Sequence, residues 1–326
     1  MMLFITNRSP MGSMNADLTK EVPYEFDLDN NAAGKHLFFC RRDGSENYSE
    51  IGSEKLMNEL NAGKEKQILF FIHGFSNLPE PDIFPRAQQL QSLLDAETAG
   101  VREIRVLPLI WPCDNDMGIV QDYWDDQKSA DHSAASMSRL LQKFMAWRHE
   151  LGEDKQCMKR MNILAHSMGN RVLRETIRAW NKYDLASGVP MLFRNTFLMA
   201  ADVVNETLEY GQSGELICHA SRNVVVYHAS DDLALRASKV SNLKNKIASR
   251  RLGHTGPENM ENAPKNIYAV DCDDFNNSYD YPKGHSYFLD DGKGNPGEVF
   301  KHMYKALKTG RVDVGNNIQR CLILEK

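Results

Sequence analysis

Seven short, continuous apolar runs recur along the chain, and they constrain its fold more than any other feature. Each run is followed by a turn signal and then by a segment with helical periodicity. Uninterrupted apolar runs of this length, alternating with helices, are typical of parallel strands buried on both faces. The runs are His36–Phe39, Ile68–Phe75, Ile104–Pro112, Met161–Ser167, Asn195–Val203, Asn223–Ser230 and Asn266–Cys272.

The segments between these runs carry apolar residues at steps of three and four, as in Leu173, Ile177 and Trp180 or in Ala134, Met137, Leu141 and Phe144. Such spacing lays one apolar stripe of a helix on a sheet. Strands that alternate with helices imply right-handed crossovers. The sequence therefore predicts an α/β fold, with helices on both faces of a mostly parallel central sheet. Because such folds often run to this length as one unit, we expect a single domain over residues 1–326.

Two segments break the alternation of strands and helices. Residues 111–133 are acidic and aromatic, and residues 241–265 are basic at first and then rich in Gly, Pro and Asn. We expect both to be long loops or part-helical excursions inserted between strands. In parallel folds, loops at the ends of strands often surround the functional site. A solvated surface insertion explains residues 241–265 equally well.

The composition limits the classes of partner. Hydrophobic residues make up 42% of the chain, enough for a large core, and the net charge of −5 offers no basic face for nucleic acid. The six cysteines are far apart and lack metal-ligand spacing, which predicts free thiols, no metal and no cofactor. The apolar run before Asn7 is too short for a signal peptide or a membrane span. These features predict a cytoplasmic protein without an integral membrane segment.

The stretch NILAHSMGNRV, residues 162–172, places Ser167 between a predicted strand and a predicted helix. A serine at such a joint adopts a strained backbone conformation that presents its hydroxyl above the sheet. Small residues are needed two positions before and after it, and Ala165 and Gly169 meet this need. The helix that follows favours developing negative charge. Ser167 is therefore the candidate nucleophile.

An acyl-transfer site also needs two N–H donors for an oxyanion. In hydrolases of this type one is the residue after the serine, here Met168, and the other follows an early strand, where FIHGFSN offers Phe75. We expect His73 and His166 to pack beside the site or to line a pocket. The aromatic residues Trp111, Tyr123 and Trp124 are further candidates for an apolar pocket, or else anchor the long loop.

The base and the acid come from later strands. Because the members follow the order nucleophile, acid, histidine, the base is sought among His254, His285 and His302. His285, in YPKGHSYFLDD, is the candidate base, and the other two are expected on the surface. The acid has three candidates at predicted strand ends, each of which could instead cap a helix. These are Asp202, Asp231 and Asp232.

Taken together, the motifs resemble a largely uncharacterised bacterial branch of the α/β-hydrolase superfamily whose members are catalogued as predicted esterases or lipase-like hydrolases. The likeness rests on FITNR, IHGFSN, LIWPCD, AHSMGNRVL, LMAADV, VYHASDDLALRAS and GHSYF, which run through most of the chain in the branch's order. Members commonly carry alanine at the position of Ala165. The resemblance implies a triad of Ser167, Asp232 and His285.

We therefore expect a serine hydrolase, and specifically a carboxylesterase that cleaves small to medium acyl esters through an acyl-enzyme. Its partner would be a small-molecule ester. The same triad would also suit an acyltransferase or a thioesterase. The alternative that is not an enzyme is a binding protein that keeps the α/β-hydrolase fold but does not catalyse its chemistry.

Overall fold

The computed structural model describes residues 1–12, 20–113, 119–150, 157, 159–185, 188–236, 250–315, 317 and 319–325. The chain divides into two compact units. The amino-terminal unit comprises Met1–Arg160 and Glu175–Gly188, and the carboxy-terminal unit comprises Met161–Arg174 and Val189–Lys326. Helix α4 (Gly169–Tyr183) continues from one unit into the other. That all 326 residues form one domain stays a prediction.

The sheet of the amino-terminal unit has the strand order β5-β6-β1-β3-β4-β2. Strand β6 pairs in parallel with both β5 and β1, and the remaining pairs are antiparallel. The bounds are Met2–Thr6 (β1), Val22–Tyr24 (β2), Phe38–Gly44 (β3), Asn47–Glu50 (β4), Gln67–Ile72 (β5) and Ile104–Ile110 (β6).

The prediction of a parallel strand at His36–Phe39 is wrong, because this run opens β3, which pairs antiparallel with β1 and β4. A two-residue turn at Ser45 and Glu46 joins β3 directly to β4. Parallel neighbours need a crossover of about a dozen residues, whereas a two-residue turn can join only antiparallel strands. A short apolar run does not distinguish the two kinds of pairing.

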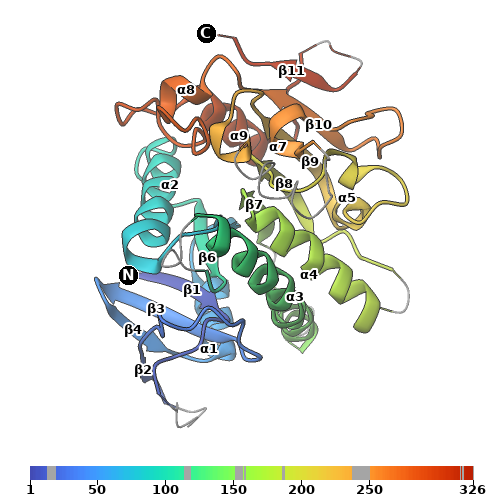
Figure 1. Cartoon of the computed structure of the whole chain (residues 1–326). Helices are drawn as coiled ribbons and strands as arrows, with labels where there is room; N and C mark the ends of the chain where they lie inside the picture. The colour runs from blue at the N-terminus through green and yellow to red at the C-terminus, as the bar shows by residue number, and fades with distance from the viewer. Residues whose placement is uncertain are drawn as a thin grey trace. The chain divides into compact units, whose positions relative to one another are not determined.

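Besides the end of α4, the described helical segments of this unit are α1 (Ser53–Ala62), the π-helix η1 (Pro79–Ile83), α2 (Phe84–Ala96) and α3 (Ile119–Glu150). Helix α2 packs on β6, and α1 packs on β3 (Figure 1). None of the helices in the described ranges combines the length and apolar character needed to cross a membrane.

Helix α3 occupies most of the segment 111–133, for which the sequence left open a long loop or a part-helical excursion. Residues 119–133 belong to this helix, and residues 114–118 lie outside the described residues. Its buried face includes Asp126, Ala130 and Ser133 at helical spacing. Polar partners satisfy this face, since Ser76 N–H donates to Asp126 and the Asn7 amide donates to Ser133 Oγ. Because the residues on this buried face are polar or small, the sequence lacks the apolar periodicity that usually predicts a helix.

The carboxy-terminal unit contains a parallel sheet in the order β7-β8-β9-β10-β11. Helix α9 packs on β8, and α5 and α7 pack on β9 (Figure 1, yellow to red). The predicted α/β class with a mostly parallel sheet is thereby confirmed. The bounds are Arg160–His166 (β7), Phe193–Met199 (β8), Asn205–Leu208 (η3), Glu215–Ala220 (α5), Ser221–His228 (β9), Leu252–Thr255 (α7), Ile267–Asp271 (β10), Asn276–Tyr279 (α8), Glu298–Thr309 (α9) and Cys321–Ile323 (β11).

Residues 241–249 of the second predicted insertion lie outside the described residues, and its described part contains the short helix α7. Leu252 N–H donates to Val203 O and Gly253 N–H donates to Ala201 O, so the chain is bound to the end of β8. A Cβ atom at Gly253 would lie 2.1 Å from Ala201 N. Glycine permits this close approach of two backbones.

Three buried asparagines form a ladder at the amino ends of β7, β8 and β9. Asn162, Asn195 and Asn223 are aligned in register. The Asn195 amide donates to Asn162 Oδ1 over 2.8 Å, and the Asn223 amide donates to Asn195 Oδ1 over 2.9 Å. The central side chain, that of Asn195, therefore provides a hydrogen-bond partner to both of its buried neighbours.

Replacing Asn195 by leucine is expected to lower the free energy of unfolding by about 2–5 kcal/mol, because both neighbouring amides lose a buried partner. Urea unfolding measures this loss. The exposed Arg222, replaced by leucine, serves as the control and should change stability by less than about 0.5 kcal/mol. Equal effects of the two substitutions would show that the ladder contributes nothing specific.

Candidate active site

Ser167 lies on a sharp turn between β7 and α4. Its φ angle is 53°, in the left-handed region that costs a non-glycine residue about 1–3 kcal/mol unless its surroundings hold it. Two backbone hydrogen bonds to the end of β8 do so: Ser167 N–H donates to Met199 O over 3.0 Å, and Asp202 N–H donates to Ser167 O over 3.2 Å. The strained turn expected of a nucleophile is present at this residue.

A side chain that the sequence reasoning missed also holds this turn. The Asn170 amide lies within hydrogen-bonding distance of Ala165 O (3.0 Å), Ser167 O (2.9 Å) and Met199 O (3.4 Å). An asparagine directly after the Ser-Met-Gly motif was the available signal. Met168, at the start of α4, is fully buried, and among the described residues none accepts a hydrogen bond from its backbone N–H. That N–H can serve an incoming oxygen.

His285 and Asp232 form a close pair in the same unit as Ser167. His285 Nδ1–H donates to Asp232 Oδ2 over 2.6 Å, and Asp232 is fully buried. The other carboxylate oxygen, Oδ1, accepts from Leu235 N–H over 3.0 Å. A proton on Nδ1 leaves Nε2 of the neutral imidazole as the basic nitrogen. This is the tautomer that a general base for a serine requires.

The two other candidate acids have different partners. Asp231 accepts hydrogen bonds from the side-chain amides of Asn276 and Asn277. Asp202 forms an ion pair with Arg251, in which Nε lies 3.1 Å from Oδ1. Of the three carboxylates that the sequence left open, Asp232 is the one in contact with His285.

Two further side chains position the loop that carries His285. Asp280 Oδ2 accepts from His285 N–H over 2.8 Å and from Ser286 N–H over 2.7 Å. His166 Nε2–H donates to His285 O over 3.2 Å, and the centres of the two imidazole rings are 4.8 Å apart. His166, the last residue of β7 and the residue before the nucleophile, is therefore packed against the base. The contribution of Asp280 had no recognisable signal in the sequence.

Of the two late histidines that we expected on the surface, His302 is buried and His254 is half-buried. His302, in α9, is buried, accepts from the Tyr227 hydroxyl over 2.8 Å and donates to Asp313 O over 2.7 Å. Burial lowers its pKa. His254, in α7, is half-buried. His302 is covered by residues that precede α9 in the chain, including Tyr227. The helical periodicity of α9 alone could not predict this burial.

In the amino-terminal unit, His73 and Trp111 are both fully buried and stack with ring centres 5.2 Å apart. His73 Nδ1–H donates to Gly74 O over 2.8 Å, while Nε2 accepts from Trp111 N–H over 3.2 Å. The Trp111 indole N–H donates to His73 O over 2.9 Å. Burial lowers the pKa of His73 to about 3. This burial argues against pocket-lining roles and favours anchoring of the FIHGFSN loop.

The buried His73 predicts a loss of stability in acid. Its folded-state pKa lies below the unfolded value, so the unfolded state takes up the proton first as the pH falls below about 6.5. Between pH 7 and pH 5 this residue should lower the free energy of unfolding by about 2 kcal/mol. Urea unfolding of His73→Asn should show a pH-dependent loss that is smaller by that amount. His219→Asn, at an exposed position, is the control and should keep the parent's pH dependence. If His73→Asn also kept it, burial of His73 would not be the cause of the stability loss in acid.

Of the remaining residues of the predicted oxyanion loop and pocket, Tyr123 and Trp124 belong to α3, and Phe75 contacts this helix. Phe75 is half-buried and meets the ring of Tyr123 edge-on, with centres 5.6 Å apart. The Asn77 amide donates to Phe75 O over 2.6 Å. Tyr123 is buried, whereas Trp124 is half-buried. Tyr123 thus fits an anchoring role, and Trp124 keeps an accessible part that a pocket role would need.

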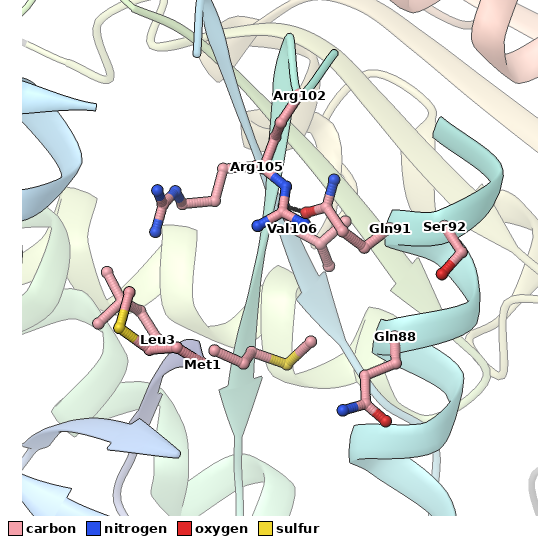
Figure 2. Close-up of a pocket in the computed structure, with 9 residues that line it drawn as sticks. Met1, Leu3, Gln88, Gln91, Ser92, Arg102, Arg105 and Val106 are labelled. Atoms are coloured by element: carbon pink, nitrogen blue, oxygen red, sulfur yellow. Dashed lines mark hydrogen bonds between the residues drawn. The ribbon is translucent and has the colours of Figure 1, made fainter. Parts of the chain in front are cut away.

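A cavity of about 440 Å³ opens in the amino-terminal unit at the amino ends of β1 and β6. Figure 2 shows Met1 and Leu3, Arg105 and Val106, and the α2 residue Gln91 around it. Gln91 hydrogen-bonds to Ile104 O and Val106 N–H, and Arg105 pairs with Glu65. Parallel α/β sheets bind ligands at the carboxyl ends of their strands. This cavity is therefore not the candidate active site.

Within the described ranges, no group of three or more His, Cys, Asp or Glu side chains is arranged to hold a metal ion.

A family model described as "Alpha/beta hydrolase of unknown function (DUF900)" matches residues 49–293, which is 245 of the 326 residues. Comparisons with curated proteins and with solved structures gave no match. The matched range contains Ser167, Asp232 and His285 and covers three quarters of the chain, so the chain belongs to this family of α/β hydrolases.

Proposed function

We propose that this protein is a serine hydrolase, and specifically a carboxylesterase that acts on small to medium acyl esters. The observation that carries the proposal is the 2.6 Å contact between His285 Nδ1 and the buried Asp232, in the unit that also holds Ser167 on its strained turn. Family membership supports the coarser statement of an α/β hydrolase.

In the proposed acylation step, Ser167 Oγ attacks the ester carbonyl carbon while His285 Nε2 takes the hydroxyl proton. The positive charge that forms on the imidazole is stabilised by Asp232, which is already hydrogen-bonded to Nδ1. The oxygen of the tetrahedral intermediate accepts from Met168 N–H, and Phe75 N–H is the second donor expected from the sequence. His285 then passes its proton to the leaving alcohol, and Ser167 keeps the acyl group.

Water completes the cycle in the proposed deacylation step. His285 removes a proton from water as its oxygen attacks the acyl carbon, and the same proton returns to Ser167 Oγ when the acyl–serine bond breaks. The products are a carboxylic acid and the free enzyme. None of these steps calls on a group beyond the chain's own residues, the ester and water.

The proposed activity is tested by hydrolysis of p-nitrophenyl esters with acyl chains from acetate to decanoate. A carboxylesterase should release p-nitrophenol from the shorter esters, with a fluorophosphonate probe labelling Ser167 and abolishing the activity. Absence of both labelling and hydrolysis would support a binding protein instead. If the rate of acyl transfer to an added alcohol or thiol exceeded the rate of hydrolysis, the protein would be an acyltransferase.

A cytosolic location accompanies the proposal. No disulfide bond joins any of the six cysteines, all of which lie among the described residues, and five of them are buried. Free thiols persist in reducing compartments, whereas secreted proteins tend to form disulfides.

A further inference from the structure

Arg251 is a buried arginine whose hydrogen-bonding capacity is largely unused by the described residues. Its exposed fraction is 7%. Nε lies 3.1 Å from Asp202 Oδ1, yet the N–H direction does not make a hydrogen bond. In the described part of the chain, no residue accepts a hydrogen bond from Nη1 or Nη2 of this side chain. Nε alone is both buried and unpartnered, so the two terminal nitrogens keep contact with solvent.

Other shielded arginines of this protein differ in this respect. Arg8, which is 1% exposed, donates to three backbone carbonyls, those of Asp27, Leu28 and Cys113. Arg320 donates to the carbonyls of Pro264 and Met260. In Arg251 only Nε has lost hydration without a replacement, which is costly, while Nη1 and Nη2 have no acceptor other than solvent among the described residues. The terminal N–H groups of Arg251 are therefore available to an acceptor that comes from outside the described chain.

The position of Arg251 connects it to the candidate nucleophile. Its ion-pair partner, Asp202, donates its backbone N–H to Ser167 O over 3.2 Å. The backbone of Arg251 bridges to Val204, and the adjoining Leu252 donates to Val203 O over 2.8 Å. These contacts fix Arg251 to the strand end that holds the turn of Ser167.

Resting on the proposed esterase function, we propose that Arg251 recognises an anionic group, a carboxylate or a phosphate-like group, carried by the ester that Ser167 attacks. A guanidinium presents two edges of N–H groups, each able to bind an oxyanion in a bidentate manner. Asp202 lies at the Nε edge, and the edge formed by Nη1 and Nη2 remains for the substrate. The substrate class is then an ester of a dicarboxylic or phosphono-carboxylic acid.

The test compares kcat/KM for three p-nitrophenyl esters: the monoester of glutaric acid, its neutral methyl diester and the ester of 4-phosphonobutyric acid. Loss of hydrogen bonds to a charged group costs about 1.5–3 kcal/mol, so the parent should prefer an anionic ester over the neutral one by about 10- to 100-fold. Arg251→Met should remove this preference, and Arg251→Lys should retain part of it. A preference for the carboxylate or for the phosphonate identifies which group is bound.

Arg250→Met is the matched control, because the Arg250 side chain is 65% exposed and lies 3.9 Å from Glu258. It should keep the parent's preference. A purely structural role of Arg251 would lower the rates on charged and neutral esters equally and leave the preference unchanged. That result, or a parent without preference, would overturn the proposal.

Two further measurements separate this proposal from the esterase assignment. Glutarate should competitively inhibit hydrolysis of the neutral ester by the parent, which requires no variant that might fail to fold. If no ester is hydrolysed and Ser167 is not labelled, the esterase proposal fails on its own. In that case, calorimetric titration of the parent with glutarate and with 4-phosphonobutyrate tests the anion site by itself. If neither compound bound, the proposed anion site would be excluded.

Discussion

Replacing Ser167 by alanine is expected to lower kcat on a p-nitrophenyl ester by about 10⁴- to 10⁶-fold, because no other group can form the acyl-enzyme. The turn itself should survive, since its backbone hydrogen bonds to Met199 and Asp202 do not involve the hydroxyl. Initial rates of p-nitrophenol release measure the loss. Labelling by a fluorophosphonate should disappear in parallel.

Ser213 provides the matched control for this substitution. It is a half-buried serine of the same unit, whose hydroxyl lies 3.2 Å from Thr207 Oγ1. Ser213→Ala should keep the parent's kcat and labelling. If Ser167→Ala retained more than about a hundredth of the parent's kcat, a covalent mechanism through this residue would be excluded.

Replacing Asp232 by asparagine is expected to lower kcat by about 10³- to 10⁴-fold. The amide of asparagine can donate to Nδ1 and thereby favour the tautomer whose Nε2 carries the proton, which cannot accept one from serine. It also removes the charge that stabilises the imidazolium. The contact of 2.6 Å between Asp232 and His285 is the basis of this expectation.

Asp231→Asn and Asp202→Asn are the controls, since both residues were candidates for the acid and have other partners. Asp231 accepts from the amides of Asn276 and Asn277, and Asp202 pairs with Arg251. On the neutral ester, each should stay within about tenfold of the parent, because neither carboxylate contacts His285. A large loss confined to Asp202→Asn would move the acid to the end of β8.

Local patterns were sufficient for much of the architecture. Six of the seven apolar runs coincide with parallel strands, because burial on both faces demands continuous apolar sequence. The first run failed, since the pairing direction of β3 depends on the turn at Ser45 and Glu46 rather than on the strand itself. The start of α3 was missed because Asp126 and Ser133 on its buried face are satisfied by residues from distant parts of the chain.

In the candidate site, too, some features follow from the local sequence and others depend on distant residues. The turn at Ser167 has a local cause, since a strand, small neighbours and a helix start determine its backbone. The residues by themselves left three acids open, and the family resemblance singled out Asp232. Asp231 and Asp232 are chemically identical neighbours, and their partners, the amides of α8 and the imidazole of His285, come from 45 or more residues later. No local pattern contains that information.

By itself, then, the sequence determined the order of strands and helices, the α/β class and the turn that presents Ser167. All of these follow from interactions between residues close together in the chain. Only the tertiary structure decided which carboxylate faces His285, how Asn170 and Asp280 hold the turn and the base, and that Arg251 lies buried beside Asp202 with unused donors. Side-chain direction, burial and hydrogen-bond satisfaction depend on residues that folding alone brings together.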